Sequence, residues 1–370
     1  MRMRTLWLPL VVGAALVACG GGSDGNALPD ISGKVLTVNG PMEPAKLGIT
    51  LPHEHIFINF APLDHIVPEP TDINVLTPDR NPGGLTYYPD ALEEIERFKD
   101  FGGGTIVDVT NFGLSRDPNA LKKISDESGL NVIMGAGVYM RPFHPADMDK
   151  VTVEELTQII VDDVTVGAQG TEIRSGVIGE IGLGDFSTPD TLIDNEVKSV
   201  TAAARASRLT GAPINLHTFV TERAAHEVLD ILEKEGVDLN HVTMSHVGGS
   251  ASFDMDAIVR LIDRGVYVER DFLGQAPGSA MGGSRPEQVA DWVVELAARG
   301  DKYAKRILLS HDICIQDQLY MNQGGGYAYI LEKVVPLLEG RVSAGVIDDI
   351  LKNNPQRALA FTRPQELRKS

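Results

Sequence analysis

The stretch Thr105-Ile106-Val107-Asp108-Val109 is largely apolar and rich in β-branched side chains. Such a run is typical of a parallel strand that is buried on both faces. Seven further runs of this character occur at residues 48–58, 131–139, 176–182, 213–218, 242–248, 266–272 and 306–313. Segments with helical periodicity separate them, at 89–101, 118–129, 153–167, 189–210, 221–235, 254–264 and 285–299. The alternation predicts an α/β fold, a (β/α)8 TIM barrel closed by right-handed crossovers, with a doubly wound open sheet as the alternative.

The composition is that of one large globular domain. The chain has 370 residues, of which 43% are hydrophobic and 23% charged, and a single barrel takes about 200 to 400 residues. Asp and Glu number 51 against 33 Lys and Arg, so the net charge is −18. An excess of negative charge argues against broad electrostatic attraction to nucleic acid or anionic lipid. We therefore expect a small-molecule substrate and no nucleic-acid partner.

Residues 1–18 have the composition of a bacterial secretory signal. Arg2 and Arg4 precede an apolar stretch at 6–17 that is too short to span a bilayer. The stretch ends in Leu16-Val17-Ala18-Cys19, which resembles the lipobox of bacterial lipoproteins, where the cysteine is acylated. We expect lipidation of Cys19, followed by a flexible tether over 19–33. The predicted location is periplasmic, with the membrane contacted only through the lipid anchor. An ordinary cleaved signal is the alternative.

The chain has only one other cysteine, Cys314. If Cys19 carries lipid, no disulfide can form within one chain, so residues 34–370, the predicted barrel, must be stabilised by their hydrophobic core. Cys314 lies two residues after Asp312 and is better interpreted as a small buried residue than as a nucleophile.

Six side chains of metal-ligand type lie at or near the downstream ends of predicted strands: His53, His55, Glu180, His217, His246 and Asp312. The downstream ends of barrel strands meet at the face where TIM-barrel enzymes carry their active sites. Side chains two apart on a strand point the same way, so His53 and His55 project into the barrel while Glu54 faces away. A single His-x-His pair is weak evidence, since packing histidines are at least as common. The six together predict two divalent cations per chain, with zinc as first choice and manganese or cobalt as alternatives.

Several motifs make the sequence similar to the phosphotriesterase family of the amidohydrolase superfamily, over nearly the whole mature chain. They are Leu51-Pro52-His53-Glu54-His55, Gly104-Thr105-Ile106-Val107-Asp108, Arg116-Asp117-Pro118, Val132-Ile133-Met134-Gly135-Ala136-Gly137, Gly176-Val177-Ile178-Gly179-Glu180-Ile181-Gly182, Ser245-His246 and Ser310-His311-Asp312. The resemblance implies a binuclear metal centre in which His53, His55 and Asp312 hold one ion. It implies that His217 and His246 hold the second, and that the protein is a homodimer.

The bridging ligand departs from that of the best-known family members, which use a carboxylated lysine on the fourth strand. No lysine occurs between Lys150 and Lys198, so the resemblance assigns the bridge to Glu180, as in a subgroup of the family, together with a hydroxide. A second departure is Val247-Gly248-Gly249, which offers none of the carboxylates that often relay protons in phosphotriester-cleaving members. We therefore do not expect efficient phosphotriester hydrolysis.

Further candidates come from the downstream ends and loops of the strands. Predicted substrate contacts are Tyr139, Arg141, Arg270 and Tyr327. The two arginines are suited to bind a carboxylate or phosphate, and ion pairs with neighbours such as Glu269 or Asp147 are an equal interpretation. Asp108 and Asn215 are candidates for orienting the metal ligands, against an equal chance that they are core residues. His311 should point away from the site by strand alternation.

The predicted function is hydrolysis. Two bound cations lower the pKa of a bridging water toward about 7, and the resulting hydroxide attacks an electrophilic carbon or phosphorus. Asp312 is the candidate to accept the proton and pass it on. We expect esters or lactones as substrates, with phosphotriesters in a minor role. Amide hydrolysis by the same centre is one alternative, and a non-catalytic substrate-binding lipoprotein is the alternative of another class.

Overall fold

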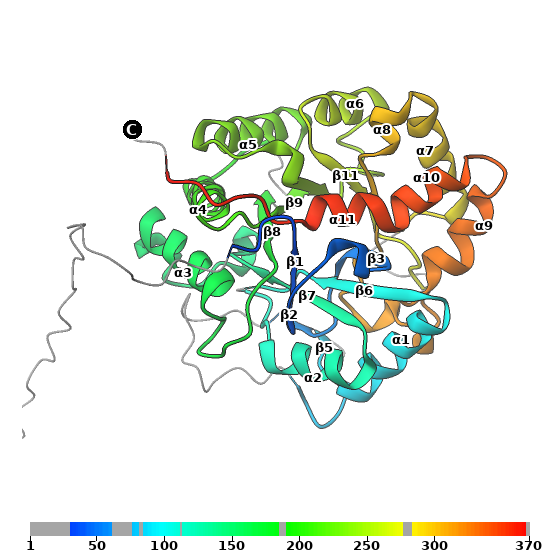
Figure 1. Cartoon of the computed structure of the whole chain (residues 1–370), viewed down its shortest axis with the longest axis horizontal. Helices are drawn as coiled ribbons and strands as arrows, with labels where there is room; N and C mark the ends of the chain where they lie inside the picture. Colours follow the sequence, from blue (N-terminus) through cyan, green and yellow to red (C-terminus); the bar gives the residue numbers. More distant parts are fainter. Residues whose placement is uncertain are drawn as a thin grey trace, which may run out of the picture.

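The computed structural model describes residues 30–60, 76–80, 84–111, 113–184, 190–276 and 283–367. The predicted signal peptide at 1–18, Cys19 and the tether up to residue 29 lie outside the described residues and stay predictions. Eight parallel strands with helices around them form a nearly closed barrel (Figure 1). The strands are β3 (Ile49–Glu54), β6 (Gly103–Asp108), β7 (Asn131–Ala136), β8 (Val177–Gly184), β9 (Ile214–Phe219), β10 (Val242–Ser245), β11 (Tyr267–Arg270) and β12 (Ile307–Leu309). The predicted TIM barrel is confirmed, and the open doubly wound sheet is not the fold.

The first and last barrel strands meet at a junction of a different kind from the others. Ladders of hydrogen bonds join the strands in the order β12-β11-β10-β9-β8-β7-β6-β3. Between β3 and β12 there are instead isolated backbone hydrogen bonds, from Asp312 N to His53 O (3.3 Å) and from His55 N to Ile313 O (3.1 Å). We call this junction, made by residues 53–55 and 310–313, the β3/β12 seam. It completes the ring next to two of the predicted metal ligands.

Helices cover the outside of the barrel (Figure 1). Between consecutive strands lie α1 (Tyr88–Asp100), α2 (Pro118–Ser128), α3 (Val153–Thr165), α4 (Asp194–Thr210), α5 (Glu222–Glu235), α6 (Met255–Asp263), α7 (Pro286–Ala298) and the short α8 (Asp301–Ala304). The start of α4 is later than the predicted residue 189. Glu196, the third residue of α4, accepts hydrogen bonds from the backbone N of Ile193 and of Gly184, each 2.9 Å. This acidic cap fixes the helix start at Asp194.

Local chemistry explains where other helices begin and end. Asp117 precedes α2 and accepts from the backbone N of Ala120 at 2.9 Å, and Gly129 ends the helix with a φ of 72°. Thr152 and Glu155 form a reciprocal capping box at the start of α3. Side-chain caps of this kind satisfy backbone N–H groups that the helix itself leaves unpaired.

Two short hairpins were not anticipated by the sequence analysis. β1 (Val35–Thr37) and β2 (Gly40–Met42) pair antiparallel, and β4 (Ile58–Asn59) pairs with β5 (Gly84–Leu85). The first hairpin covers the upstream end of the barrel, because Val35 and Leu36 are fully buried and Val38 N donates to Val132 O at 2.9 Å. The second follows β3 at the downstream end.

After β12 the chain forms a closing helical segment. Its α-helices are α9 (Val335–Leu338), α10 (Ala344–Asp348) and α11 (Asn354–Leu359), with π-helical turns at Ile330–Val334 and Asp349–Asn353. The buried Asn354 side chain donates to the carbonyls of Ala304 (3.0 Å) and Ile307 (2.7 Å), which ties α11 to the start of β12. Within the part of the chain that the structure describes, no helix has the length and apolar character needed to cross a membrane.

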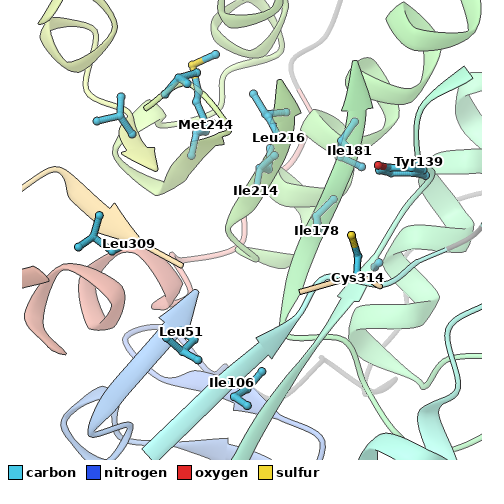
Figure 2. Packing of buried hydrophobic residues seen from close by; sticks show 14 of the residues in the cluster. Leu51, Ile106, Tyr139, Ile178, Ile181, Ile214, Leu216, Met244, Leu309 and Cys314 are labelled. Carbon is cyan, nitrogen blue, oxygen red and sulfur yellow. The ribbon is translucent and has the colours of Figure 1, made fainter. Parts of the chain in front are cut away.

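One large hydrophobic cluster joins the strands and the helices around them. Figure 2 shows part of it, with Leu51, Ile106, Ile178, Leu216 and Met244 contributed by neighbouring strands. Tyr139 lies beside Ile181 near the tip of β8 and belongs to the same cluster, as does Cys314. Cys314 is 6% exposed, and burial raises the pKa of its thiol well above the usual value. It is therefore a protonated core residue.

Candidate metal centre

His53 and His55 enter the barrel from the end of β3. His53 is fully buried and His55 is 2% exposed, and their ring centroids lie 5.9 Å apart. Both Nε2 atoms face Glu180 on β8, at 3.3 Å from His53 and 3.2 Å from His55. Glu54, between the two histidines, instead contacts His311 in the β3/β12 seam. Strand alternation therefore separates the pair of histidines from the glutamate between them.

Glu180 is the centre of the site because its two oxygens face different partners. Oε1 lies 3.2 Å from His55 Nε2, whereas Oε2 lies 2.6 Å from His217 Nδ1 and 3.8 Å from His246 Nε2. Burial opposes ionisation of Glu180, but the charge of His217 and its hydrogen bond hold the pKa of the carboxyl well below its ordinary value. A charged carboxylate in this place can bridge two cations about 3.5–4 Å apart.

Asp312 and His246 reach the site from strained backbone. β10 and β12 end at Ser245 and Leu309, so both residues follow a strand rather than end it. Their φ angles are 57° for Asp312 and 67° for His246, in the left-handed region that non-glycine residues seldom adopt. Such conformations cost about 1–3 kcal/mol and are concentrated at functional sites. Oδ1 of Asp312 lies 3.3 Å from His55 Nε2 and 3.6 Å from His53 Nε2.

The six residues His53, His55, Glu180, His217, His246 and Asp312, called here the ligand cluster, fit a pair of metal ions. Two groups have donor atoms within 4.8 Å of one another, His53 with His55 and Asp312, and His53 with Glu180 and His246. His217 Nδ1 lies 2.8 Å from His246 Nε2 and so joins the second group. In the described chain, the buried atoms His53 Nε2 and Glu180 Oε1 have no well-directed hydrogen bond. Unpaired buried polar atoms cost about 1–3 kcal/mol each, and bound cations would remove that cost.

Hydroxyl groups orient the two histidines of β3. Nδ1 of His53 lies 2.8 Å from Ser245 Oγ, and Ser245 donates its own hydroxyl to Asn215 Oδ1 at 3.1 Å. Ser245 must then accept from His53 Nδ1, which leaves the lone pair on Nε2, inside the cluster. Nδ1 of His55 lies 2.8 Å from Thr110 Oγ1. Asn215, a candidate from the sequence, thus acts on His53 through Ser245.

Asp108 and Tyr327 support the backbone around His55. Asp108 accepts from Ile56 N at 2.6 Å and from Thr110 N at 3.0 Å. The Tyr327 hydroxyl donates to the backbone carbonyl of His55 at 2.8 Å, and Tyr327 is only 1% exposed. The sequence analysis placed Tyr327 among the substrate contacts. The structure instead places it behind His55, where it supports the position of that ligand.

Asp271 is a functional residue that the sequence analysis missed. Its Oδ1 lies 2.9 Å from His246 Nδ1, and its Oδ2 accepts from His246 N at 2.9 Å. Burial opposes a charge on His246, but the Asp271 carboxylate raises the pKa of the imidazole well above its ordinary value. A carboxylate on the outer nitrogen of a metal-ligating histidine fixes the ring and strengthens it as a ligand. The available signal was an acidic residue close to the downstream end of the seventh predicted strand, 266–272.

Glu269 was considered from the sequence as an ion-pair partner of Arg270, but it points into the barrel. It is fully buried, and its Oε1 lies 3.9 Å from His53 Nδ1. Burial and the nearby charge of Asp271 raise the pKa of Glu269 well above the usual value. Because its carboxyl is directed to His53, Glu269 does not pair with Arg270 as the alternative interpretation had it.

The remaining substrate candidates differ in their surroundings. The Tyr139 hydroxyl lies 3.3 Å from His217 Nε2, at the edge of the ligand cluster. Arg141 forms a two-pronged ion pair with the buried Glu196, at 2.9 and 3.1 Å. That pair holds the Arg141 guanidinium against α4, so its surroundings do not support the predicted substrate role. Arg270 lies beside a cavity that is described next.

Two cavities adjoin the ligand cluster. The apolar cavity, of about 210 Å³, is lined by His55, Ile58, Phe60, Tyr139, Met140, Phe143, His217, Phe219, Phe272, Asp312, Cys314 and Ile315. The polar cavity, of about 290 Å³, is lined by Thr218, Phe219, His246, Gly248, Gly249, Ser250, Asp271, Phe272, Gly283 and Ser284. Phe219 and Phe272 line both. A bond held at the cluster would therefore have one substrate half on each side.

Comparison with known proteins agrees with this geometry. A family model described as "Phosphotriesterase family" matches residues 33–359. The chain belongs to the phosphotriesterase family. It is accordingly a hydrolase of that family, whose members use a binuclear metal centre, and the ligand cluster is the group of residues in this chain that could hold one.

Relatives of this phosphotriesterase-family chain match it along almost their whole lengths. An N-acetyltaurine hydrolase of Salmo salar is 36% identical, covering 90% of this chain and 99% of the relative. A solved resiniferatoxin-binding protein from Rhodobacter sphaeroides has a TM-score of 0.76 at 32% identity, covering 89% of this chain and 95% of that one. The phosphotriesterase homology protein of Escherichia coli, solved with phosphate in its active site, has a TM-score of 0.71 at 29% identity, covering 85% and 99%.

Proposed function

We propose that this protein hydrolyses the amide bond of an N-acyl compound. The main support is the gathering of five further ligand-type side chains around Glu180, directly beside an apolar cavity. Relatives named N-acetyltaurine hydrolase, including one from Xenopus tropicalis at 34% identity over 90% of this chain, favour an amide over the ester or lactone expected from the sequence. Ester hydrolysis needs the same groups and is the second candidate. The predicted homodimer stays a prediction.

Asp312 has the position and the charge needed of a proton carrier. When bound, two divalent cations supply hydroxide at neutral pH and polarise a carbonyl oxygen. Burial opposes ionisation of Asp312, but the hydrogen bond from His55 and the charge of His246 lower the pKa of its carboxyl. The ionised carboxylate lines the apolar cavity and can accept a proton there. Returning that proton to the departing nitrogen assists cleavage of an amide, because the nitrogen then leaves as a neutral amine and not as a strongly basic anion.

The apolar cavity accounts for the acyl half of the substrate. Phe60, Met140, Phe143 and Ile315 contribute apolar side chains to its wall. Burying one methylene group contributes about 0.8 kcal/mol, so a longer acyl chain should bind better until the cavity is filled. Tyr139, on the same wall and in contact with His217, lies where the acyl carbonyl would meet the cluster.

The test is a substrate panel on the full-length, metal-loaded protein. N-acyl amides, alkyl and aryl esters, lactones and phosphotriesters are compared by kcat/KM, with metal content measured in the same preparation. We expect the highest value for an N-acyl amide. Turnover of lactones or alkyl esters without any turnover of amides would replace the amide proposal by the ester one. A protein that binds no metal and turns over nothing would instead be a binding protein.

The Asp312→Asn variant tests the proton carrier within the same panel. General acid–base catalysis contributes about 10²–10⁴-fold, so kcat should fall by that order while the metals remain bound. Full activity in a variant that retains its metals would remove Asp312 from this role.

A further inference from the structure

The polar cavity contains a feature that the metal chemistry does not use. Arg270 belongs to β11 and is 8% exposed. Buried arginines are almost always paired with an acid, yet within the described ranges Arg270 forms no ion pair. Its one hydrogen bond there runs from Nη2 to Ser284 Oγ at 2.9 Å, and its buried Nε has no partner. A guanidinium carries five N–H donors, so most of its hydrogen-bonding capacity is unused.

The carboxyl groups of the two neighbouring acids, Asp271 and Glu269, are directed to other residues. Both oxygens of Asp271 contact His246, one on the ring and one on the backbone N. Glu269 points to His53 on the other side of the strand. Among the described residues that line the polar cavity, Asp271 is the only acid. In a chain with a net charge of −18, this uncompensated buried cation stands out.

Two glycines bring the guanidinium close to the cavity. A Cβ atom on Gly248 would lie 2.5 Å from Arg270 Cβ, so any side chain there would displace the arginine. A Cβ atom on Gly249 would lie 3.2 Å from Arg270 Cζ and 3.3 Å from Nη2. Gly249 and Ser284 both line the polar cavity and both lie against the guanidinium. The Gly248-Gly249 pair thus leaves room for the positively charged side chain.

The hydroxyl groups on this wall complete a site for an anion. Ser284 accepts from Arg270, so its own proton is free to be donated to a ligand. Ser250 adds a second hydroxyl, and Gly249 and Gly283 leave backbone exposed on the same wall. Among the described residues that line the apolar cavity there is no arginine or lysine, and Asp312 would repel an anion there. The two substrate halves are therefore distinguished by chemistry.

We propose that Arg270 and Ser284 bind an anionic group, a carboxylate or a sulfonate, on the amine half of the substrate. The apolar cavity then takes the acyl half, and the preferred substrate class is an N-acylated small amino acid or aminosulfonate. The inference rests on the proposed amide hydrolysis for the substrate class, but the anion site itself does not require turnover. Arg270 is in this view a specificity residue and takes no part in bond cleavage.

The kinetic experiment uses three substrates that differ only at the far end of the amine. They are N-acetyltaurine (sulfonate), N-acetyl-β-alanine (carboxylate) and N-acetylethanolamine (neutral), given to the full-length, metal-loaded protein. Removing one partner of a buried charge pair typically costs a factor of about 30 to several thousand. Arg270→Met should therefore lower kcat/KM for a preferred anionic substrate by about 100-fold or more, with little change for the neutral one. The relative loss on sulfonate and carboxylate identifies which anion the site prefers.

Arg264→Met is the matched control. Arg264 follows α6 on the outside of the barrel and pairs with Asp230 and Glu233, at 2.8 and 2.7 Å. The Arg264→Met variant should keep the wild-type ratio of kcat/KM for the anionic substrates to kcat/KM for the neutral one. An equal loss on all three substrates in Arg270→Met would overturn the proposal, because a structural role of Arg270 has that signature.

A binding experiment separates the anion site from the amide chemistry. Propane-1-sulfonate and 1-propanol, which contain no bond to hydrolyse, are titrated calorimetrically into wild-type protein and the Ser284→Ala variant. We expect the sulfonate alone to bind, and more weakly after loss of the serine hydroxyl. Such binding supports the anion site even if no amide is turned over. Equal binding of both probes to the wild type overturns it, and that comparison does not depend on the folding of any variant.

Discussion

Two buried carboxylates near the same two histidines behave in opposite ways, Glu54 in the β3/β12 seam and Glu180 in the ligand cluster. Glu54 accepts four hydrogen bonds, from Ser310 Oγ (2.7 Å), His311 N (2.8 Å), His311 Nδ1 (2.8 Å) and Ile313 N (2.9 Å). Glu180 faces imidazole nitrogens, and its Oε1 lacks a well-directed hydrogen bond. Both side chains are buried. A satisfied network serves the fold, whereas an unsatisfied one needs a ligand.

The two regions are built from alternate residues of the same short segments. In the first segment His53 and His55 face the cluster and Glu54 faces the seam. In the last segment Asp312 faces the cluster while His311 bonds Glu54. One strand end therefore supplies both the site and the closure of the barrel that holds it. Substitutions in the two regions should consequently separate loss of metal from loss of stability.

Glu180→Gln should have the largest effect. The amide keeps the shape of the side chain but removes the negative charge that faces both donor groups, so the metal pair should not assemble. Substituting a residue that hydrogen-bonds a metal ligand typically lowers activity by about 10–100-fold. The loss for Glu180→Gln should be larger than that. Elemental analysis and kcat/KM check this together. A variant with two metals per chain and near-normal turnover would contradict the central role of Glu180.

Glu54→Gln is the matched substitution in the seam, and here the expected loss is one of stability. The amide cannot accept all four hydrogen bonds, and breaking a buried charged network costs about 3–5 kcal/mol. Urea unfolding of variant and wild type measures the difference in free energy of unfolding. The folded fraction should still bind two metals. Unchanged stability with lost metal would mean that the seam and the cluster have been assigned to the wrong roles.

Asp271→Asn should have an intermediate effect on the cluster. The amide keeps the size of the side chain, but it can accept only one of the two hydrogen bonds that the Asp271 carboxylate takes from His246, and it carries no charge to strengthen the imidazole as a ligand. Metal affinity should fall by about 10–100-fold. Activity should fall less than metal affinity, and added metal should restore it. Competition with a chelator gives the affinity. Activity that excess metal does not restore would point to a role in the reaction itself.

A third buried carboxyl, Glu94 on α1, is only partly hydrogen-bonded, in contrast to the fully bonded Glu54. Its substitution should have the smallest effect of those considered. Its Oε1 accepts from Met321 N at 3.2 Å, and its Oε2 has no partner in the described chain. Burial raises the pKa of Glu94 from 4.5 to about 7. The folded state therefore binds more protons than the unfolded state between these values, and stability is lost as the pH rises through about 7.

The Glu94→Gln variant isolates the contribution of Glu94 to the pH dependence of stability, because glutamine does not ionise. Relative to wild type, the variant should gain about 1–3 kcal/mol in free energy of unfolding between pH 4.5 and pH 8. Unfolding curves at several pH values measure the difference. A difference that does not vary with pH would show that Glu94 ionises normally in the folded protein.

Much of the fold could be predicted because its signals are local. Residues 105–109 and their counterparts show by composition alone that they are buried parallel strands, and the helices between them follow a 3.6-residue period. The β1–β2 hairpin was missed because its three-residue strands carry no periodicity, and its burial depends on contacts with residues such as Val132. The start of α4 depended on the capping bonds of Glu196.

What the sequence determined by itself is which strand ends carry the ligand-type side chains and, for His53, Glu54 and His55, which way the side chains face. Both follow from the two-residue repeat of a strand and from the common direction of barrel strands. Only the tertiary structure decided that Asp271 supports His246, that Glu196 holds Arg141, and that Arg270 forms no ion pair with the residues that the structure describes. These pairings join residues on different elements. A hydrogen bond or ion pair of that kind is set by distances of a few ångströms across the fold, which no pattern along the chain encodes.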